Sequence, residues 1–193
     1  VDGSAVRLST NDDEVATTGS DIINAGSGDN QILAGLSDDE VTSLGGVDVV
    51  LGDNGELDYS AGILASVASS ETALGGDDTL TLGEGDNIVV AGQGADTVDT
   101  GSGSDTVLGD SGELTYVDTA LTNAVSSGTA LGGADALTLG EGDNIVIAGQ
   151  GADTVTTGSG SDTVIGDSGE INFEAGVMTD LQSTAISSGG DDS

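Results

Sequence analysis

A nine-residue period, nested inside a 57-residue one, constrains this chain more than any other feature of its sequence. The stretch GQGADTVDT at 92–100 aligns with GSGSDTVLG at 101–109: Gly recurs at positions 1 and 3, Asp at position 5 and Val at position 7. Near-copies of a longer segment begin at Leu51, Leu108 and Ile165, which are 57 residues apart. Repetition at fixed spacing is typical of folds in which successive units stack on one another.

The 57-residue period divides the chain into modules. We predict that each module holds five nine-residue units followed by twelve irregular residues. The first segment is interpreted as the tail of a preceding module and the last as the start of a further one. The predicted segments are 1–16, 17–73, 74–130, 131–187 and 188–193.

Two positions of the nine-residue unit have separate roles. Position 7 is apolar in every unit, which predicts a core. Position 5 holds Asp or Asn in the first four units of each module, and Leu57, Leu114 or Ile171 in the fifth. Turns favour Gly and Asp, but a turn does not require carboxylates stacked at one register, where like charges repel. Repulsion repeated at every unit indicates a cation between the layers.

The charge balance excludes several classes of partner. The chain has 35 acidic residues and one basic residue, for a formal charge of −34. A surface of this sign repels nucleic acid and anionic lipid and attracts cations. The longest apolar runs are far too short to span a membrane, so we expect no membrane insertion. The absence of Cys and His removes thiolate and imidazole chemistry, and we expect no enzymatic activity.

The repeated units resemble the calcium-binding nonapeptide G-G-x-G-x-D-x-U-x of the RTX (haemolysin-type) family. Segments that carry the likeness are LGGDDTL at 74–80, GSGSDTV at 101–107 and GDSG at 109–112, and the resemblance covers most of the chain. It implies an all-β fold, a parallel β-roll or right-handed β-solenoid with two sheets of short strands. Each nonapeptide would form half a coil, with a turn that binds Ca²⁺ and a strand that fills the core.

The resemblance also implies a set of metal ligands. Each ion would lie between the turns of units n and n+2, held by both position-5 side chains and by turn carbonyls. The implied pairs are Asp21 with Asp39, Asn30 with Asp48, Asp78 with Asp96, Asn87 with Asp105, Asp135 with Asp153, and Asn144 with Asp162.

Two departures from the family pattern affect these sites. Asn replaces Asp in every second unit, where the preceding Asp29, Asp86 or Asp143 is a substitute ligand, so we expect weaker or rearranged sites. The fifth unit has no carboxylate at position 5 but carries one at position 1, and we expect a different geometry there or no ion. The residues concerned are Asp53, Asp110 and Asp167.

The ligand chemistry points to calcium independently of the resemblance. Ca²⁺ takes six to eight oxygen ligands, and carboxylates with backbone carbonyls are what this sequence offers. Zn²⁺ prefers His or Cys, and Mg²⁺ prefers to keep its waters. Multiple calcium ions are therefore the expected cofactor.

The twelve irregular residues allow two interpretations. They either form a sixth, longer half-coil, which gives three full coils and about 14 Å of roll per module, or they link separate rolls. The continuous roll is favoured because no Pro and little charge marks a hinge. Apolar residues such as Ile63, Leu64 and Val67 match one face of a short helical turn.

One sheet of the roll is expected to have an apolar outer face. Even-numbered units place Ile88, Val90 and Leu108 beside the core position, whereas odd-numbered units place mostly Thr, Asp and Glu there. Exposed apolar faces of this kind usually have a covering element or a partner. We expect lateral packing, against either the irregular segments or a second copy of the protein.

These features favour a structural function. We expect a calcium-dependent repeat segment of a secreted bacterial surface protein, an adhesin stalk or extracellular fibre, that leaves the cell through a type I system and folds outside it. An accessory domain of a secreted enzyme or toxin is the alternative. Ice binding by the Thr-bearing sheet is a third, although Glu40, Asp99 and Ala136 interrupt its Thr ladder.

Overall fold

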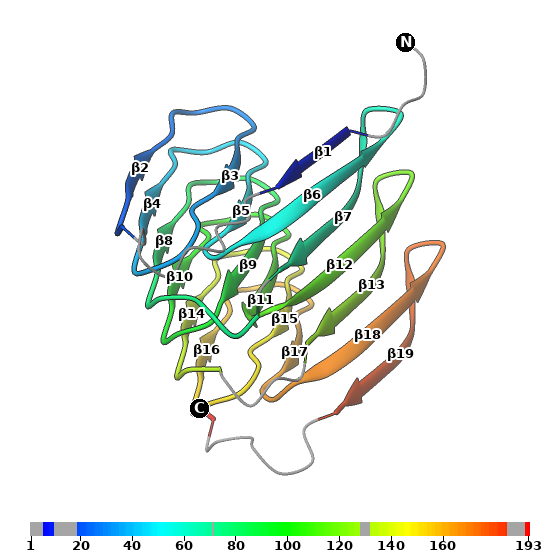
Figure 1. Ribbon diagram of the computed structural model, residues 1–193. Helices are drawn as coiled ribbons and strands as arrows, with labels where there is room; N and C mark the ends of the chain where they lie inside the picture. Colours follow the sequence, from blue (N-terminus) through cyan, green and yellow to red (C-terminus); the bar gives the residue numbers. More distant parts are fainter. Residues whose placement is uncertain (1–5, 10–18, 71, 128–131, 185–191) are drawn as a thin grey trace.

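The described part of the chain forms three β-sheets stacked face to face (Figure 1). The computed structural model describes residues 6–9, 19–70, 72–127, 132–184 and 192–193. No helix in this described part of the chain is long and apolar enough to cross a membrane.

Two of the sheets form the roll. Successive half-coils alternate between them, so the strands that pair within one sheet are one full coil apart and run parallel. Short runs of Thr, Val and Ile suit strands, and the Gly-rich segments between them turn the chain. The odd sheet contains β2 (Ile22–Asn24), β4 (Glu40–Thr42), β8 (Thr79–Thr81), β10 (Thr97–Asp99), β14 (Ala136–Thr138) and β16 (Thr154–Thr156). The even sheet contains β3 (Gln31–Leu33), β5 (Val49–Leu51), β9 (Ile88–Gly92), β11 (Thr106–Asp110), β15 (Ile145–Ile147) and β17 (Thr163–Ile165). The predicted all-β parallel β-roll is confirmed.

The interior of the roll is filled by position 7. Leu80 and Val98 from the odd sheet meet Val89 and Val107 from the even sheet, and all four side chains are fully buried. One apolar residue per half-coil therefore lines a continuous core, as the period predicts.

The third sheet is antiparallel and is built from β-hairpins. Its order is β1-β6-β7-β12-β13-β18-β19, so that each hairpin pairs with the next. Its strands are β1 (Val6–Ser9), β6 (Gly55–Ser60), β7 (Ile63–Ser69), β12 (Gly112–Val117), β13 (Ala120–Ser126), β18 (Gly169–Glu174) and β19 (Val177–Ser183).

Each hairpin closes with a two-residue turn in which both residues have positive φ. The middle hairpin uses Asp118 and Thr119, at φ of 48° and 72°. Two positive φ values in succession match the twist of the flanking strands, which is why such turns dominate short hairpins.

The hairpins overturn the expected third coil. The fifth unit and the twelve irregular residues are neither half-coils nor a helical turn: they form β6–β7, β12–β13 and β18–β19. Apolar residues at both position 5 and position 7 of the fifth unit alternate as in an ordinary strand, which buries one face. The roll still continues without a break, because β4 pairs with β8 and β5 with β9 across the hairpin. Two coils add about 10 Å of roll per module, compared with the predicted 14 Å.

The numbers of strands in the three layers match. Each module adds two strands to the odd sheet, two to the even sheet and one two-stranded hairpin to the third sheet. Because all strands are spaced by about 4.8 Å, the three sheets advance together along the roll.

The hairpin sheet covers the outer face of the even sheet. Leu51, Leu108 and Ile147 on the even sheet form a second core with hairpin residues that include Leu57 and Leu114. This finding confirms the expected packing against the irregular segments. The chain's own hairpins, instead of a second copy, cover this apolar face.

The ends of the array are described only in part. Within segment 1–16 the structure describes β1, which pairs with β6 and occupies the place of a preceding hairpin's second strand. Within segment 188–193 it describes only 192–193, and the rest of both predicted segments lies outside the described residues.

The second core should account for a large part of the stability. Leu114 is completely buried between the two layers, whereas Val117 on the same strand is 58% exposed. Leu114→Ala should lower the free energy of unfolding of the calcium-loaded chain by about 2–5 kcal/mol, through lost transfer energy and a cavity. Val117→Ala should change it by no more than about 0.5 kcal/mol. Denaturant titration measures both, and equal effects would contradict the two-core arrangement.

Candidate metal centre

Two stacks of turns line the edges of the roll. The turns that enter the odd sheet form the odd edge, and the turns that enter the even sheet form the even edge. Position 5 of each turn from Asp21 to Asp162 lies directly before its strand. The odd edge carries Asp21, Asp39, Asp78, Asp96, Asp135, Asp153 and Asp192, and the even edge carries Asn30, Asp48, Asn87, Asp105, Asn144 and Asp162.

Hydrogen bonds join the position-5 residues of each edge into a ladder. Each residue donates its backbone N–H to the side-chain Oδ1 of the equivalent residue one coil further on. The distances along the odd edge, from Asp21 to Asp192, are 2.6, 2.8, 2.8, 2.9, 2.9 and 3.1 Å. Along the even edge, from Asn30 to Asp162, they are 2.9, 3.1, 2.8, 3.0 and 3.1 Å.

The ladders bring together all six predicted pairs and extend them. Asp39 also joins Asp78 of the next module, and Asp48 joins Asn87. Sequence reasoning missed these contacts between modules because it placed a third coil between them. Equivalent Asp residues are 18 positions apart within a module and 39 apart across a hairpin. The second spacing could predict these contacts only once the hairpin itself had been recognised.

The odd edge leaves one oxygen of each buried aspartate without a partner. Five successive side chains, no more than 3% exposed, have Oδ2 buried with no hydrogen bond. They are Asp39, Asp78, Asp96, Asp135 and Asp153. A buried carboxylate oxygen without a donor carries a large desolvation cost, so each of these atoms requires a positive partner.

Burial also perturbs the acidity of the odd edge. Desolvation raises the pKa of Asp78 to about 7, that of Asp96 to about 9 and that of Asp135 to about 8, against hydrogen bonds from the ladder N–H groups that lower it. Neighbouring carboxylates in the stack raise the same pKa values further. Ionisation of the odd-edge aspartates is therefore unfavourable when no cation is present.

The even edge is chemically different. The amide Nδ2 of Asn87 donates to the carbonyls of Gly83 at 3.1 Å and Gly85 at 3.0 Å, both in its own turn. Asn30 and Asn144 make the same two bonds. The hydroxyl of Thr100 donates to Oδ2 of Asp105 at 2.6 Å, and Ser43 does so to Asp48.

The substitute ligands at position 4 lie at the surface of the even edge. Asp29, Asp86 and Asp143 each accept the backbone N–H of the residue 18 positions later, at 2.9, 2.8 and 2.7 Å. These bonds tie one turn to the next. The three carboxylates are exposed.

The fifth-unit aspartates lie where the chain leaves the roll for a hairpin. Asp53 is 4% exposed and its carboxylate accepts the backbone N–H of Gly76 at 3.3 Å and that of Gln93. A Cβ on Gly75 would lie 2.0 Å from the Asp53 carboxylate, so any other residue there would displace that side chain. Burial, with Asp78 and Asp39 nearby, raises the pKa of Asp53 to about 8.

Asp110 occupies the equivalent place in the next module. It accepts the backbone N–H of Gln150, and its Oδ1 is buried without a partner. Burial raises its pKa to about 7, and the negative charge of Asp153 adds to that shift. Asp167 repeats the position, and its Oδ1 is likewise buried without a partner.

The donor set suits a hard cation with oxygen ligands. Within the described residues, no three or more acidic side chains form a group placed to hold a metal. The odd-edge carboxylates are instead stacked in a row, one per coil, so a bound ion must also draw on backbone carbonyls. Ca²⁺ accepts such mixed oxygen ligands more readily than other common ions.

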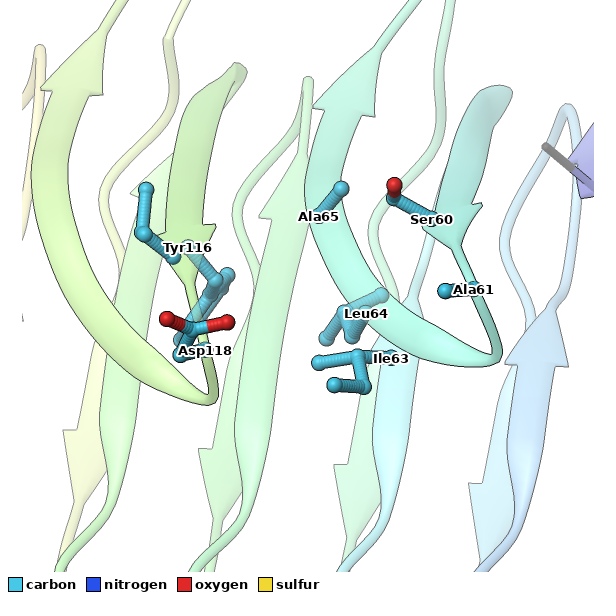
Figure 2. A pocket seen from close by; sticks show the side chains of 8 residues that line it. Ser60, Ala61, Ile63, Leu64, Ala65, Tyr116 and Asp118 are labelled. Carbon is cyan, nitrogen blue, oxygen red and sulfur yellow. The ribbon is translucent and has the colours of Figure 1, made fainter. Parts of the chain in front are cut away.

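A pocket of about 280 Å³ lies between the turns of two neighbouring hairpins (Figure 2). Leu64 and Tyr116 contribute to its wall, and Asp118 is the acidic residue among those that line it. The lining offers no acid–base pair and none of the predicted metal ligands.

The pKa shifts predict how the calcium-free chain responds to pH. An acid whose pKa rises on folding binds more protons in the folded state, between its unfolded value near 4 and its folded value. The free energy of unfolding should therefore fall as pH rises from about 4 to about 9. Far-UV circular dichroism without calcium should show more β structure at about pH 5.5 than at about pH 8. Greater β content at the higher pH would contradict the buried, protonated odd edge.

The sequence comparison agrees with the geometry of the coils. The family model of the RTX calcium-binding nonapeptide repeat (4 copies) matches residues 15–50, 72–107 and 129–170, together more than half of the chain. The first two hairpins, β6–β7 and β12–β13, fall between the matched segments. No curated protein and no solved structure matches the chain. Repeats of this family bind calcium and occur in proteins secreted by type I systems. The chain belongs to the RTX calcium-binding nonapeptide repeat family.

Proposed function

We propose that this chain is a calcium-stiffened rod segment of a large secreted bacterial surface protein, an adhesin stalk or extracellular fibre. The observation that carries the proposal is the row of five buried Oδ2 atoms without partners on the odd edge. A calcium-free fold would leave these oxygens unpaired, and a cation placed between the coils satisfies them.

The odd-edge aspartates are the proposed ligands. Asp21, Asp39, Asp78, Asp96, Asp135 and Asp153 stack one coil apart. From Asp39 onward, Oδ1 of each accepts a backbone N–H of the preceding coil. That bond orients the carboxylate and leaves Oδ2 for the ion. Bound calcium neutralises the stacked charges and completes the coordination of Oδ2 with turn carbonyls.

Folding and binding are coupled in this proposal. A charge of −34 on 193 residues makes the calcium-free chain repel itself, which favours an unfolded state suited to secretion. Outside the cell the aspartates gain their cation, with a dissociation constant of about 10⁻⁴ to 10⁻³ M, as is typical of extracellular modules. Stacked coils stabilise their neighbours, so folding spreads cooperatively along the rod.

The fifth-unit aspartates extend the odd-edge sites at each junction. Asp53 lies close enough to Asp78 for the charge of Asp78 to raise the pKa of Asp53. Asp110 likewise lies close enough to Asp135 to raise the pKa of Asp135. Each is buried at the point where a hairpin departs from the odd edge. We infer that they add a carboxylate to the site there, which couples hairpin docking to calcium.

An accessory domain of a secreted enzyme or toxin is the alternative function. The continuous pairing of both parallel sheets across each hairpin favours the rod, because the same junction is repeated without a change in register. A roll that ends in a capped domain has no use for such a junction.

The proposed function predicts a calcium-specific folding transition. Far-UV circular dichroism of the chelated chain at neutral pH should show a cooperative increase in β structure on addition of Ca²⁺. Mg²⁺ at the same concentration should produce little change, because it dehydrates reluctantly. Full β structure at neutral pH in the presence of chelator would overturn the proposal.

The junction sites can be tested by one pair of substitutions. Asp110→Asn should raise the calcium concentration at the folding midpoint by about an order of magnitude, because a charged ligand is lost. Asp118→Asn removes the same charge from the hairpin turn and should leave the midpoint near its original value. Equal midpoints for the two variants would mean that Asp110 is not a ligand.

A further inference from the structure

The two edges of the roll satisfy their position-5 side chains in opposite ways. Both edges share the ladder in which Oδ1 accepts a backbone N–H, so the second side-chain atom carries the difference. On the odd edge that atom is a buried oxygen without a partner in Asp78 and Asp96. On the even edge it is the amide nitrogen of Asn87, or an oxygen of Asp105 that accepts a hydroxyl proton.

The orientation of each even-edge amide follows from its partners. Oδ1 of Asn87 accepts the N–H of Asp48 at 3.1 Å, so Nδ2 must face the other way. There it meets the carbonyls of Gly83, Gly85 and Thr100, at 3.0–3.1 Å. If the amide were reversed, its NH₂ group would face the N–H of Asp48, and its oxygen would face the turn carbonyls. The amide thus donates to turn carbonyls of the kind that a cation would otherwise coordinate.

A second substitution separates the edges. Where an odd-edge turn directly follows a strand of the even sheet, the residue five positions before the aspartate is Ala: Ala34, Ala91 or Ala148. Five residues before each even-edge aspartate stands a hydroxyl residue: Ser43, Thr100 and Thr157. Hydroxyls of Ser43 and Thr100 donate to Oδ2 of Asp48 and Asp105. An aspartate that is stacked on Asn, as on the even edge, therefore has a hydroxyl donor five residues before it. In the odd-edge turns that follow the even sheet, the aspartate is stacked on other Asp residues and has Ala there.

Backbone bonds close the even edge without help from a ligand. The N–H at position 3 of one turn donates to the carbonyl at position 2 of the next turn. This contact occurs five times in succession, at 2.7–2.9 Å: Gly28 to Gly45, Gly46 to Glu84, Gly85 to Ser102, Gly103 to Glu141, and Gly142 to Ser159. Within the described residues, none of the buried side-chain atoms without a partner belongs to an even-edge position-5 residue.

We propose that calcium binds along the odd edge only, and that asparagine amides and Ser or Thr hydroxyls replace it on the even edge. This inference rests on the proposed calcium-dependent function and narrows its site. The even-edge residues Asn30, Asp48, Asn87, Asp105, Asn144 and Asp162 are then turn residues whose hydrogen bonds are complete without an ion. About half of the nonapeptide turns then have the conformation of the repeat but bind no metal.

Matched Asp→Asn substitutions on the two edges test the proposal. Asp96→Asn and Asp105→Asn make the same chemical change at the same repeat position. The calcium content of each folded chain, measured by equilibrium dialysis and atomic absorption, should fall for Asp96→Asn and stay unchanged for Asp105→Asn. An equal fall for both variants would overturn one-edged binding while the calcium-dependent function stands. A wild-type chain that binds no calcium would instead remove the proposed function.

A gain-of-site variant and a direct view keep the test decisive if one variant folds poorly. Asn87→Asp combined with Thr100→Ala gives the even edge the pattern of the odd edge, and calcium content should rise. Anomalous scattering from crystals of the calcium-loaded wild-type chain should place calcium beside Asp78 and Asp96. A calcium peak beside Asp48 or Asp105 would contradict the proposal.

Discussion

Repulsion between carboxylates stacked one coil apart is the constraint on which the rest of this molecule depends. The hydrogen-bond spacing of the parallel sheets fixes the separation of the odd-edge aspartates, and burial prevents water from screening them. The ladder N–H groups bind Oδ1 of each buried aspartate, and Oδ2 is left close to the negative charge of the next coil. Under the proposed function, this otherwise unfavourable geometry makes folding depend on a cation.

The remaining interactions place stability away from that edge. Apolar residues fill the roll, and a second core joins the even sheet to the hairpins, so the even sheet is buried on both faces. The even edge is closed by amide, hydroxyl and backbone hydrogen bonds. Packing and hydrogen bonds thus satisfy the even sheet and the even edge, whereas five buried carboxylate oxygens on the odd edge have no partner. A single repeat pattern has produced two edges with different physical requirements.

The core position could be predicted from the nine-residue period, because the apolar residue at position 7 is visible in the sequence. The roll and the six position-5 pairs were predicted from the resemblance of that period to the RTX nonapeptide. The hairpins were missed although position 5 changes from Asp to Leu in the fifth unit, as at Leu114. That change restores the two-residue alternation of a strand with one buried face, but apolar Tyr116 at position 7 also fitted the roll, and the longer pattern was preferred. The unpaired Oδ2 atoms were beyond prediction, since they depend on which neighbours the three-dimensional stack supplies.

The equal advance of the three sheets has a consequence for how such a chain can change in length. One whole module adds or removes the same number of strands in each layer, so recombination between the near-identical repeats leaves every pairing intact. Loss of a single coil would shorten two layers by one strand and leave a hairpin strand with nothing beneath it. The architecture therefore permits variation in length only in steps of 57 residues, so the length of such an array is a whole number of modules.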